Sequence, residues 1–166
     1  MKKTGRSIGA LLLILASAAL ANQASAADSS LTPAGGIISL YKNNDNNHCG
    51  QYQLPTSGAQ YLGDNACKND QVYDFNIYNP GKHAIVRLGS DKPKNNQCEA
   101  GDWTFTLLAE NMTGNYRISL DSLKNAPNNT VIREGLKMLQ NNYKKGNIKG
   151  KLSCVNSWAD NTRSNN

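Results

Sequence analysis

The chain has 166 residues, which suits one ordinary domain and excludes a large multi-domain enzyme. Hydrophobic residues make up 39% and charged residues 18%, a balance that excludes both a disordered chain and a membrane bundle. The formal charge of +6 includes Lys2, Lys3 and Arg6; without these three, the 18 basic residues fall to 15 against 12 acidic ones, a net charge of +3. That surplus is too small for a protein defined by a strong positive field, so no nucleic-acid partner is expected.

The N-terminal segment has the three parts of a secretory signal. Positive charge at residues 1–6 precedes an apolar run at 8–21, and Ala24-Ser25-Ala26 supplies the small residues of a cleavage site. The apolar run is shorter than the ~20 residues that span a bilayer. We therefore expect residues 1–26 to be a bacterial signal peptide and residues 27–166 to be a periplasmic or secreted domain with no stable membrane insertion.

All four cysteines, Cys49, Cys67, Cys98 and Cys154, lie in the predicted mature part. An even number in an oxidising compartment predicts two disulfides, for which three pairings are possible. We favour Cys49 with Cys67 and Cys98 with Cys154, because neighbouring pairs close the least loop. No two cysteines have the Cys-x-x-Cys spacing of a structural zinc site, and no cofactor is expected.

The first part of the mature chain predicts β-strands. Residues 36–41 and 50–54 are rich in β-formers, and a run of Asn and Asp separates them. Apolar residues alternate with polar ones over 73–78 and 84–88 on either side of Asn79-Pro80-Gly81, a sequence that suits a type II turn. This pattern predicts a hairpin.

The second part predicts two further strands and then a helix. Residues 103–108 and 116–120 alternate, whereas Ile132, Leu136, Leu139 and Tyr143 follow a helical period from Thr130 to the Lys-Lys-Gly at 144–146. Alternation resumes over 148–155. The expected fold is a mainly β sandwich, Greek-key-like, with one C-terminal helix, and α+β is the fallback. Its parts are a β core at 36–110, an extension at 111–155 and a polar tail at 156–166.

The two histidines, His48 and His83, are the one candidate for catalysis, since a pair of imidazoles can accept and donate a proton in a small secreted nuclease. No serine-hydrolase elbow, zinc-protease helix or phosphate loop is present in the sequence. A small hydrolase is therefore an alternative interpretation only.

Two long polar loops, 43–48 and 91–101, each adjoin a cysteine that would stiffen them, which favours a role in binding. The first also presents oxygen-bearing side chains at alternate positions. However, its sixth place is His48 where a calcium loop needs Gly, so no metal is expected there. The predicted contact residues are Asn43, Asn44, Asp45, Asn47, His48, Lys94, Asn95 and Asn96.

Ile38-Ser39-Leu40-Tyr41, followed by Gly50 and then Asn69-Asp70, resembles the βγ-crystallin-type Greek-key motif, and residues 83–88 resemble the opening of a second motif. The resemblance covers residues 36–110. The family's calcium ligands would fall at Asn69 and Asp70, although Tyr73-Asp74 replaces the Ser or Thr followed by Ser that ends the site in calcium-binding members. Microbial members include inhibitors of secreted peptidases, so the resemblance implies binding.

We therefore expect a non-enzymatic binding module whose partner is another protein, in the manner of an inhibitor or immunity-like protein acting on an envelope or extracellular hydrolase. The second alternative is a carbohydrate- or surface-binding adhesin subunit. That function would require Trp103, Tyr52 and Tyr61 to be exposed.

Overall fold

The structure is a computed structural model, and it describes residues 35–160 except 44, 45, 47, 65, 69, 70, 82 and 100. The predicted signal peptide and the last six residues of the predicted tail lie outside this range. All described residues belong to one compact unit. Among them, no helix is long and apolar enough to cross a membrane.

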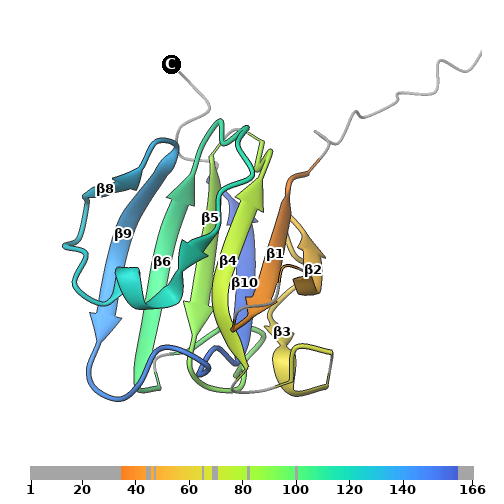
Figure 1. Ribbon diagram of the computed structural model, residues 1–166, viewed down its shortest axis with the longest axis vertical. Coiled ribbons are helices and arrows are strands. Elements are labelled where there is room, and N and C mark those ends of the chain that lie inside the picture. The colour runs from red at the N-terminus through yellow and green to blue at the C-terminus, as the bar shows by residue number, and fades with distance from the viewer. Residues whose placement is uncertain are drawn as a thin grey trace, which may run out of the picture. The chain divides into compact units, whose positions relative to one another are not determined.

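The described chain forms two antiparallel sheets, and Figure 1 labels their strands and colours them by position in the chain. Sheet A has the strand order β2-β1-β4-β7, and sheet B has the order β3-β10-β5-β6-β9-β8. The strands of sheet A are β1 (Ile37–Lys42), β2 (His48–Gln53), β4 (Val72–Tyr78) and β7 (Ile118–Ser119). The strands of sheet B are β3 (Gln60–Tyr61), β5 (Ala84–Gly89), β6 (Trp103–Ala109), β8 (Val131–Arg133), β9 (Leu136–Tyr143) and β10 (Cys154–Ala159). Two short 3-10 turns, η1 (Leu62–Asp64) and η2 (Leu120–Leu123), complete the elements, so the mainly β prediction is confirmed.

The strand order contains an internal repeat, which begins at β1 and again at β5. In the first half, β1 pairs with both β2 and β4; in the second half, β5 pairs with both β6 and β10. With β8 and β9 set aside, the two sets are β1 to β4 and β5, β6, β7 and β10. The fourth strand of each set returns to lie beside the first, which is a Greek-key connection. The third strands are exchanged, because β3 pairs with β10 and β7 pairs with β4. Strands β9 and β8 extend sheet B beyond β6.

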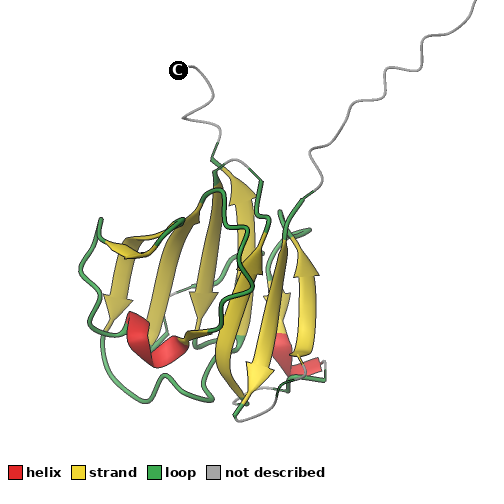
Figure 2. Ribbon diagram, turned by 45° about the horizontal axis from the view of Figure 1, so that its top comes forward, coloured by secondary structure: helices red, strands yellow, loops and turns green. Residues whose placement is uncertain are grey.

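One hydrophobic core lies between the two sheets, which Figure 2 shows from a second direction. The pairing register places apolar residues of neighbouring strands on the same face, as with Leu40 opposite Phe75 in sheet A and Leu88 opposite Phe105 in sheet B. Each such side chain contributes roughly 1.5–3 kcal/mol through its burial. The central core residues, all with no exposed surface, are Ile38, Leu40, Phe75, Ile77, Val86, Leu88, Phe105 and Leu107.

The predicted C-terminal helix is wrong, because residues 131–143 form the antiparallel pair β8 and β9. The turn between them contains Gly135, whose φ of +75° an α-helix does not accept. Leu136 and Met138 are buried with a period of two, and β9 pairs along the whole of β6. A helix here would leave the backbone of β6, a strand with seven buried residues, without a neighbour on that side.

Asn141 shows why β9 does not need a purely apolar inner face. Its side-chain nitrogen donates to the carbonyls of Leu123, Lys124 and Ala126 at 3.1, 3.0 and 2.9 Å. Its side-chain oxygen accepts from the backbone N–H of Tyr143 at 3.0 Å. One amide therefore satisfies the carbonyls at the end of η2 and fixes this segment against the sheet.

Two strand predictions also need correction. Residues 72–78 and 84–89 are strands, but they do not form a hairpin, since β4 belongs to sheet A and β5 to sheet B. Both strands alternate because each covers the same core from its own side. In place of a hairpin bond, the backbone N–H of Asn79, directly after β4, donates to the carbonyl of Met112 at 2.8 Å.

The second correction concerns the chain end. The final strand runs over 154–159 instead of 148–155, so residues 156–159 of the predicted polar tail belong to β10. Ile148 and Leu152 are buried, but the segment that contains them is irregular. Their burial produces the alternation that predicts a strand at 148–155. Of the strand predicted at 116–120, only Ile118–Ser119 forms one, and Leu120 begins η2.

The predicted disulfide pairing is confirmed. Cys49 pairs with Cys67 across 18 residues, and Cys98 pairs with Cys154 across 56 residues. The first bridge joins β2 to the segment before β4, and the second joins the loop after β5 to the start of β10. Each bridge therefore ties a loop to the sheet framework.

Replacing Gly135 with Ala should lower the free energy of unfolding by roughly 2–4 kcal/mol. A Cβ at this position would lie 2.5 Å from the carbonyl oxygen of Glu110, in addition to the cost of the left-handed conformation. Gly81→Ala is the matched control, because Gly81 has the same φ of +75° and no atom within 4 Å of the added Cβ. Urea denaturation of both variants measures the difference. Equal losses in the two variants would contradict the contact with Glu110.

Removing the Cys98–Cys154 bridge by substituting both residues with Ala should lower the free energy of unfolding by about 4 kcal/mol on the chain-entropy model. The Cys49–Cys67 bridge closes a shorter loop, so replacing Cys49 and Cys67 with Ala should lower the free energy of unfolding by about 3 kcal/mol. Urea denaturation of the two double variants beside the oxidised protein gives both values. A larger loss at the shorter bridge would show that chain entropy does not set the ranking.

Candidate functional site

The loop between β5 and β6 carries one of the two predicted contact surfaces, and we call residues 91–101 the Cys98 loop. Ser90, at its base, donates its backbone N–H to the carbonyl of Trp103 at 3.2 Å, and its hydroxyl accepts from the N–H of Trp103 at 3.2 Å. The hydroxyl of Ser153 donates to the carbonyl of Ser90 at 2.6 Å. The loop therefore leaves the sheet from a fixed base.

The tip of the Cys98 loop is a tight turn. Lys94 and Gln97 exchange backbone hydrogen bonds of 2.9 and 3.0 Å, and the two residues between them, Asn95 and Asn96, have φ values of +49° and +59°. Two consecutive positive φ angles are typical of a type I′ turn, and Asn accepts this conformation more readily than most residues. The pair of asparagines thus shapes the tip.

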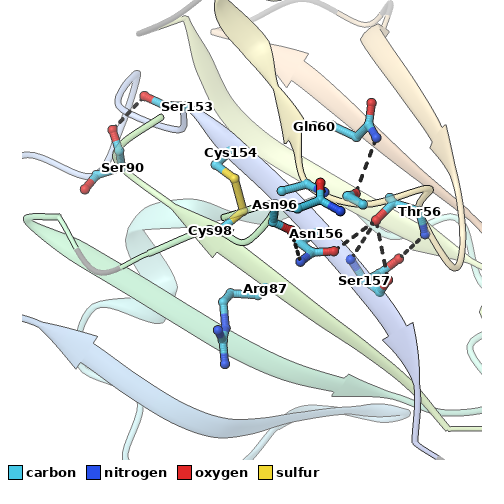
Figure 3. The surroundings of a disulfide bond; sticks show 12 residues. Thr56, Gln60, Arg87, Ser90, Asn96, Cys98, Ser153, Cys154, Asn156 and Ser157 are labelled. Carbon is cyan, nitrogen blue, oxygen red and sulfur yellow. Dashed lines mark hydrogen bonds between the residues drawn. A yellow bond between two sulfur atoms is a disulfide. The ribbon is translucent and has the colours of Figure 1, made fainter. Parts of the chain in front are cut away.

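Asn96 also ties the tip to the rest of the domain, as Figure 3 shows. Its side-chain oxygen accepts from the backbone N–H of Ala59 at 3.1 Å, and its carbonyl accepts from the side-chain nitrogen of Asn156 at 3.4 Å. Behind the tip, Cys98 is joined to Cys154, and both are buried. The loop is held at its base, its middle and its tip.

A further network fixes the segment that receives Asn96 (Figure 3). Thr56 and Ser157 exchange two hydrogen bonds, of 2.7 Å from the N–H of Thr56 and 2.8 Å from the N–H of Ser157. The hydroxyl of Thr56 also lies 3.3 Å from the side-chain oxygen of Asn156. The surface that supports the loop is therefore ordered by β10 itself.

The outward side chains of the Cys98 loop remain accessible. Lys94, Asn95, Asn96 and Gln97 are all exposed. Lys94 lies 3.9 Å from Glu99, but the two side chains are 72% and 47% exposed, so this ion pair contributes little to holding the loop. The loop thus combines a fixed backbone with exposed polar side chains.

Of the other predicted contact loop, the structure describes Asn43, Asn46 and His48, all exposed, whereas Asn44, Asp45 and Asn47 lie outside the described residues. Figure 1 shows that the end of β1 and the end of β5, from which the two loops start, lie at the same end of the sheets. The contacts of the Cys98 loop run to residues 59 and 61 of the first half and to β10.

The structure does not bring the two histidines together. His48 begins β2 and pairs with Tyr41 near one end of β1, whereas His83 follows the connection that leaves Tyr78, which is paired with Ile37 at the opposite end of β1. His83 forms a surface pair with Glu110 at 2.6 Å. The two imidazoles therefore do not face one substrate position.

The remaining candidate residues are those considered for a metal site and for carbohydrate binding by an adhesin. Asn69 and Asp70 lie outside the described residues, and within the described part of the chain no three His, Cys, Asp or Glu side chains are grouped as metal ligands. Trp103 is fully buried and donates its indole N–H to the carbonyl of Asn147 at 3.3 Å, while Tyr52 and Tyr61 are half-buried. The aromatic set proposed for an adhesin is thus not an exposed surface.

A groove of about 360 Å³, which we call the outer groove, lies over the outer face of sheet A and is not predicted from the sequence. It is lined by Ile37, Ser39, Tyr41, His48, Gln51, Asn76, Tyr78 and Asn115. The available signal was the polar residue in the middle of two apolar strands, Ser39 in β1 and Asn76 in β4, which the alternation assigns to the outer face.

Comparison with protein-family models, with curated proteins and with solved structures finds no match for this chain.

Substituting Asn96 with Gly should loosen the tip of the Cys98 loop without blocking its turn, because Gly accepts the positive φ but lacks the side-chain oxygen that holds Ala59. Losing this hydrogen bond should speed hydrogen exchange at the amide of Ala59 by roughly 2- to 10-fold. Asn95→Gly, in the same turn, is the control and should leave that rate unchanged. Equal rates in all three proteins would show that Asn96 does not anchor the tip.

Proposed function

We propose that this chain is a bacterial periplasmic or secreted binding module that captures another protein, an envelope or extracellular hydrolase, through the Cys98 loop. One observation carries the proposal: the loop is fixed by a disulfide, a tight turn and the bonds of Asn96, while its polar side chains stay exposed. A loop that is already ordered loses little conformational entropy on binding, which raises affinity. Inhibitor-like recognition uses this kind of preorganised segment.

The compartment in the proposal rests on the cysteines and the predicted signal peptide. All four thiols are paired, and disulfides persist in oxidising compartments such as the bacterial periplasm and the extracellular space. The apolar and small residues at 8–26 are the separate sequence argument for export.

We further propose that the chain is related in architecture to the βγ-crystallin-type Greek-key module. The return of β4 to the side of β1 supports this relationship, and so does the start of a second Greek-key set at β5, where the sequence resemblance places a second motif. The pair β8 and β9 is an addition beside β6.

The proposal is tested by immobilising the mature protein and capturing partners from a native envelope extract. We expect one enzyme to be retained in stoichiometric amount and to lose activity when bound. Lys94→Glu should reduce its retention about tenfold, because Lys94 stands at the tip and is 72% exposed. Lys149→Glu is the control. It makes the same charge change outside the Cys98 loop, at a residue that pairs with Asp121, so this variant should retain the enzyme as the unmodified protein does.

Two results would contradict the proposal. Retention that is equally reduced by both substitutions would indicate a general charge effect and no role for the loop. An empty capture, together with hydrolytic turnover that His48→Ala or His83→Ala abolishes, would favour the alternative of a small nuclease-like hydrolase.

A further inference from the structure

The outer groove is built from three rows of side chains that cross sheet A. The pairing register places Gln51 and Asn76 on either side of Ser39, so the middle row is entirely polar and uncharged. The rows before and after it, two residues along each strand, contain Tyr78 and Tyr41. At about 3.4 Å per residue, each aromatic row lies roughly 7 Å from the polar row.

Asn76 is the unusual residue of the middle row. It is 4% exposed, and its side-chain nitrogen donates to the side-chain oxygen of Asn115 at 2.5 Å. Its own side-chain oxygen is buried and has no hydrogen-bond partner among the described residues. A buried acceptor without a donor costs about 1–3 kcal/mol, and native structures contain few of them. Because Asn76 lines the outer groove, a donor entering the groove can supply the missing bond.

The other amide and hydroxyl of the row are already oriented. Gln51 donates from its side-chain nitrogen to the hydroxyl of Ser39 at 2.9 Å, and Ser39 is 6% exposed. Gln51 and Asn115 are exposed at the two sides of the groove. The groove therefore presents fixed amides along one line, with both donors and acceptors and no formal charge.

The two tyrosines of the outer groove, Tyr41 and Tyr78, differ in how their rings are held. The ring of Tyr41 is covered by the guanidinium of Arg117, whose Cζ lies 4.3 Å from the ring centroid and whose Nη2 lies 3.0 Å from Asp74. Tyr78 is 50% exposed and has the largest free aromatic surface in the groove lining. One ring is thus fixed in a wall, and the other is open for stacking.

We infer that the outer groove binds a neutral saccharide chain, with Asn76 accepting a hydrogen bond from a sugar hydroxyl and Tyr78 packing on the apolar face of a sugar ring. A hydroxyl both donates and accepts, so it satisfies the amide of Asn76 in either orientation. A sugar ring combines such hydroxyls with an apolar C–H face, which matches a polar row between aromatic rows. The groove volume of about 360 Å³ lies within the range of small-ligand sites.

A peptide fits this site less well. A peptide that extends a sheet needs the unpaired backbone of an edge strand, whereas the groove lies on the face of β1, which is hydrogen-bonded on both sides. The residues that line the groove include no Lys, Arg, Asp or Glu to select a charged ligand. The outer groove lies on sheet A and shares no lining residue with the Cys98 loop, which connects β5 and β6 of sheet B.

The test is titration of the 15N-labelled mature protein with cellotetraose and, separately, with chitotetraose, followed by NMR. We expect at least one of these tetrasaccharides to shift amide signals of β1, β2 and β4 in a saturable manner. Tyr78→Ala should weaken the Kd about tenfold, because the stacking surface is lost. Tyr116→Ala removes a tyrosine of matched exposure, 52%, that does not line the groove, and should leave the Kd unchanged.

Asn76→Val separates binding from structure. The substitution removes the hydrogen bond from Asn76 to Asn115, but it also removes a buried acceptor that lacks a donor and puts a good strand-former in β4, so the urea midpoint should change little. Saccharide binding should nevertheless weaken about tenfold. A purely structural Asn76 would give the reverse, a lower midpoint and an unchanged Kd. Should the variant fail to fold, Tyr78→Ala and its Tyr116→Ala control still decide the question.

Other outcomes overturn the inference. Absence of any shift with both tetrasaccharides at millimolar concentration would do so. So would saturable binding of tetra-alanine that is weakened by Tyr78→Ala, because it would assign the groove to peptides. Capture of a protein partner by the Cys98 loop should be unaffected by Tyr78→Ala, so failure of either proposal is visible without the other.

Discussion

The exchange of third strands between the two halves is the constraint on which the rest of the structure depends. Strand β3 comes from the first half but pairs with β10 of the second, and β7 comes from the second half but pairs with β4 of the first. Neither sheet is therefore complete without residues from both halves, and the single core between the sheets follows from this arrangement. The same exchange carries residues 56–61 to β10, where Asn96 of the Cys98 loop finds its anchor.

Local patterns predicted most strands but not their neighbours. Alternation locates β4, β5 and β6 to within one or two residues, and the run of β-forming residues does the same for β1. The same alternation does not determine whether two consecutive strands share a sheet, so it wrongly predicts a hairpin for β4 and β5. At 130–143, the apolar spacing fits a helix as well as a bulged strand, and only the long-range pairing of β9 with β6 decides between them.

The candidate sites show the same division. Two disulfides and the Cys98 loop could be predicted, because the number of cysteines and a long polar run can be read directly from the sequence, which allows three pairings. The anchoring of Asn96 could not, since its partner, Ala59, is 37 residues away in sequence. The outer groove escaped prediction because Gln51, Ser39 and Asn76 become one row only after three separate strands adopt their register.

The place of β10 between two earlier strands sets an order of assembly. This strand fills the gap between β3 and β5 and carries Cys154, yet it follows every other described strand in sequence and is synthesised after them. A nascent chain that lacks it has β3 without a partner, Cys98 unbridged and the edge of β5 open. Folding of sheet B therefore waits for residues 154–159, and a chain cut before Cys154 would keep an exposed, unpaired sheet edge at β5.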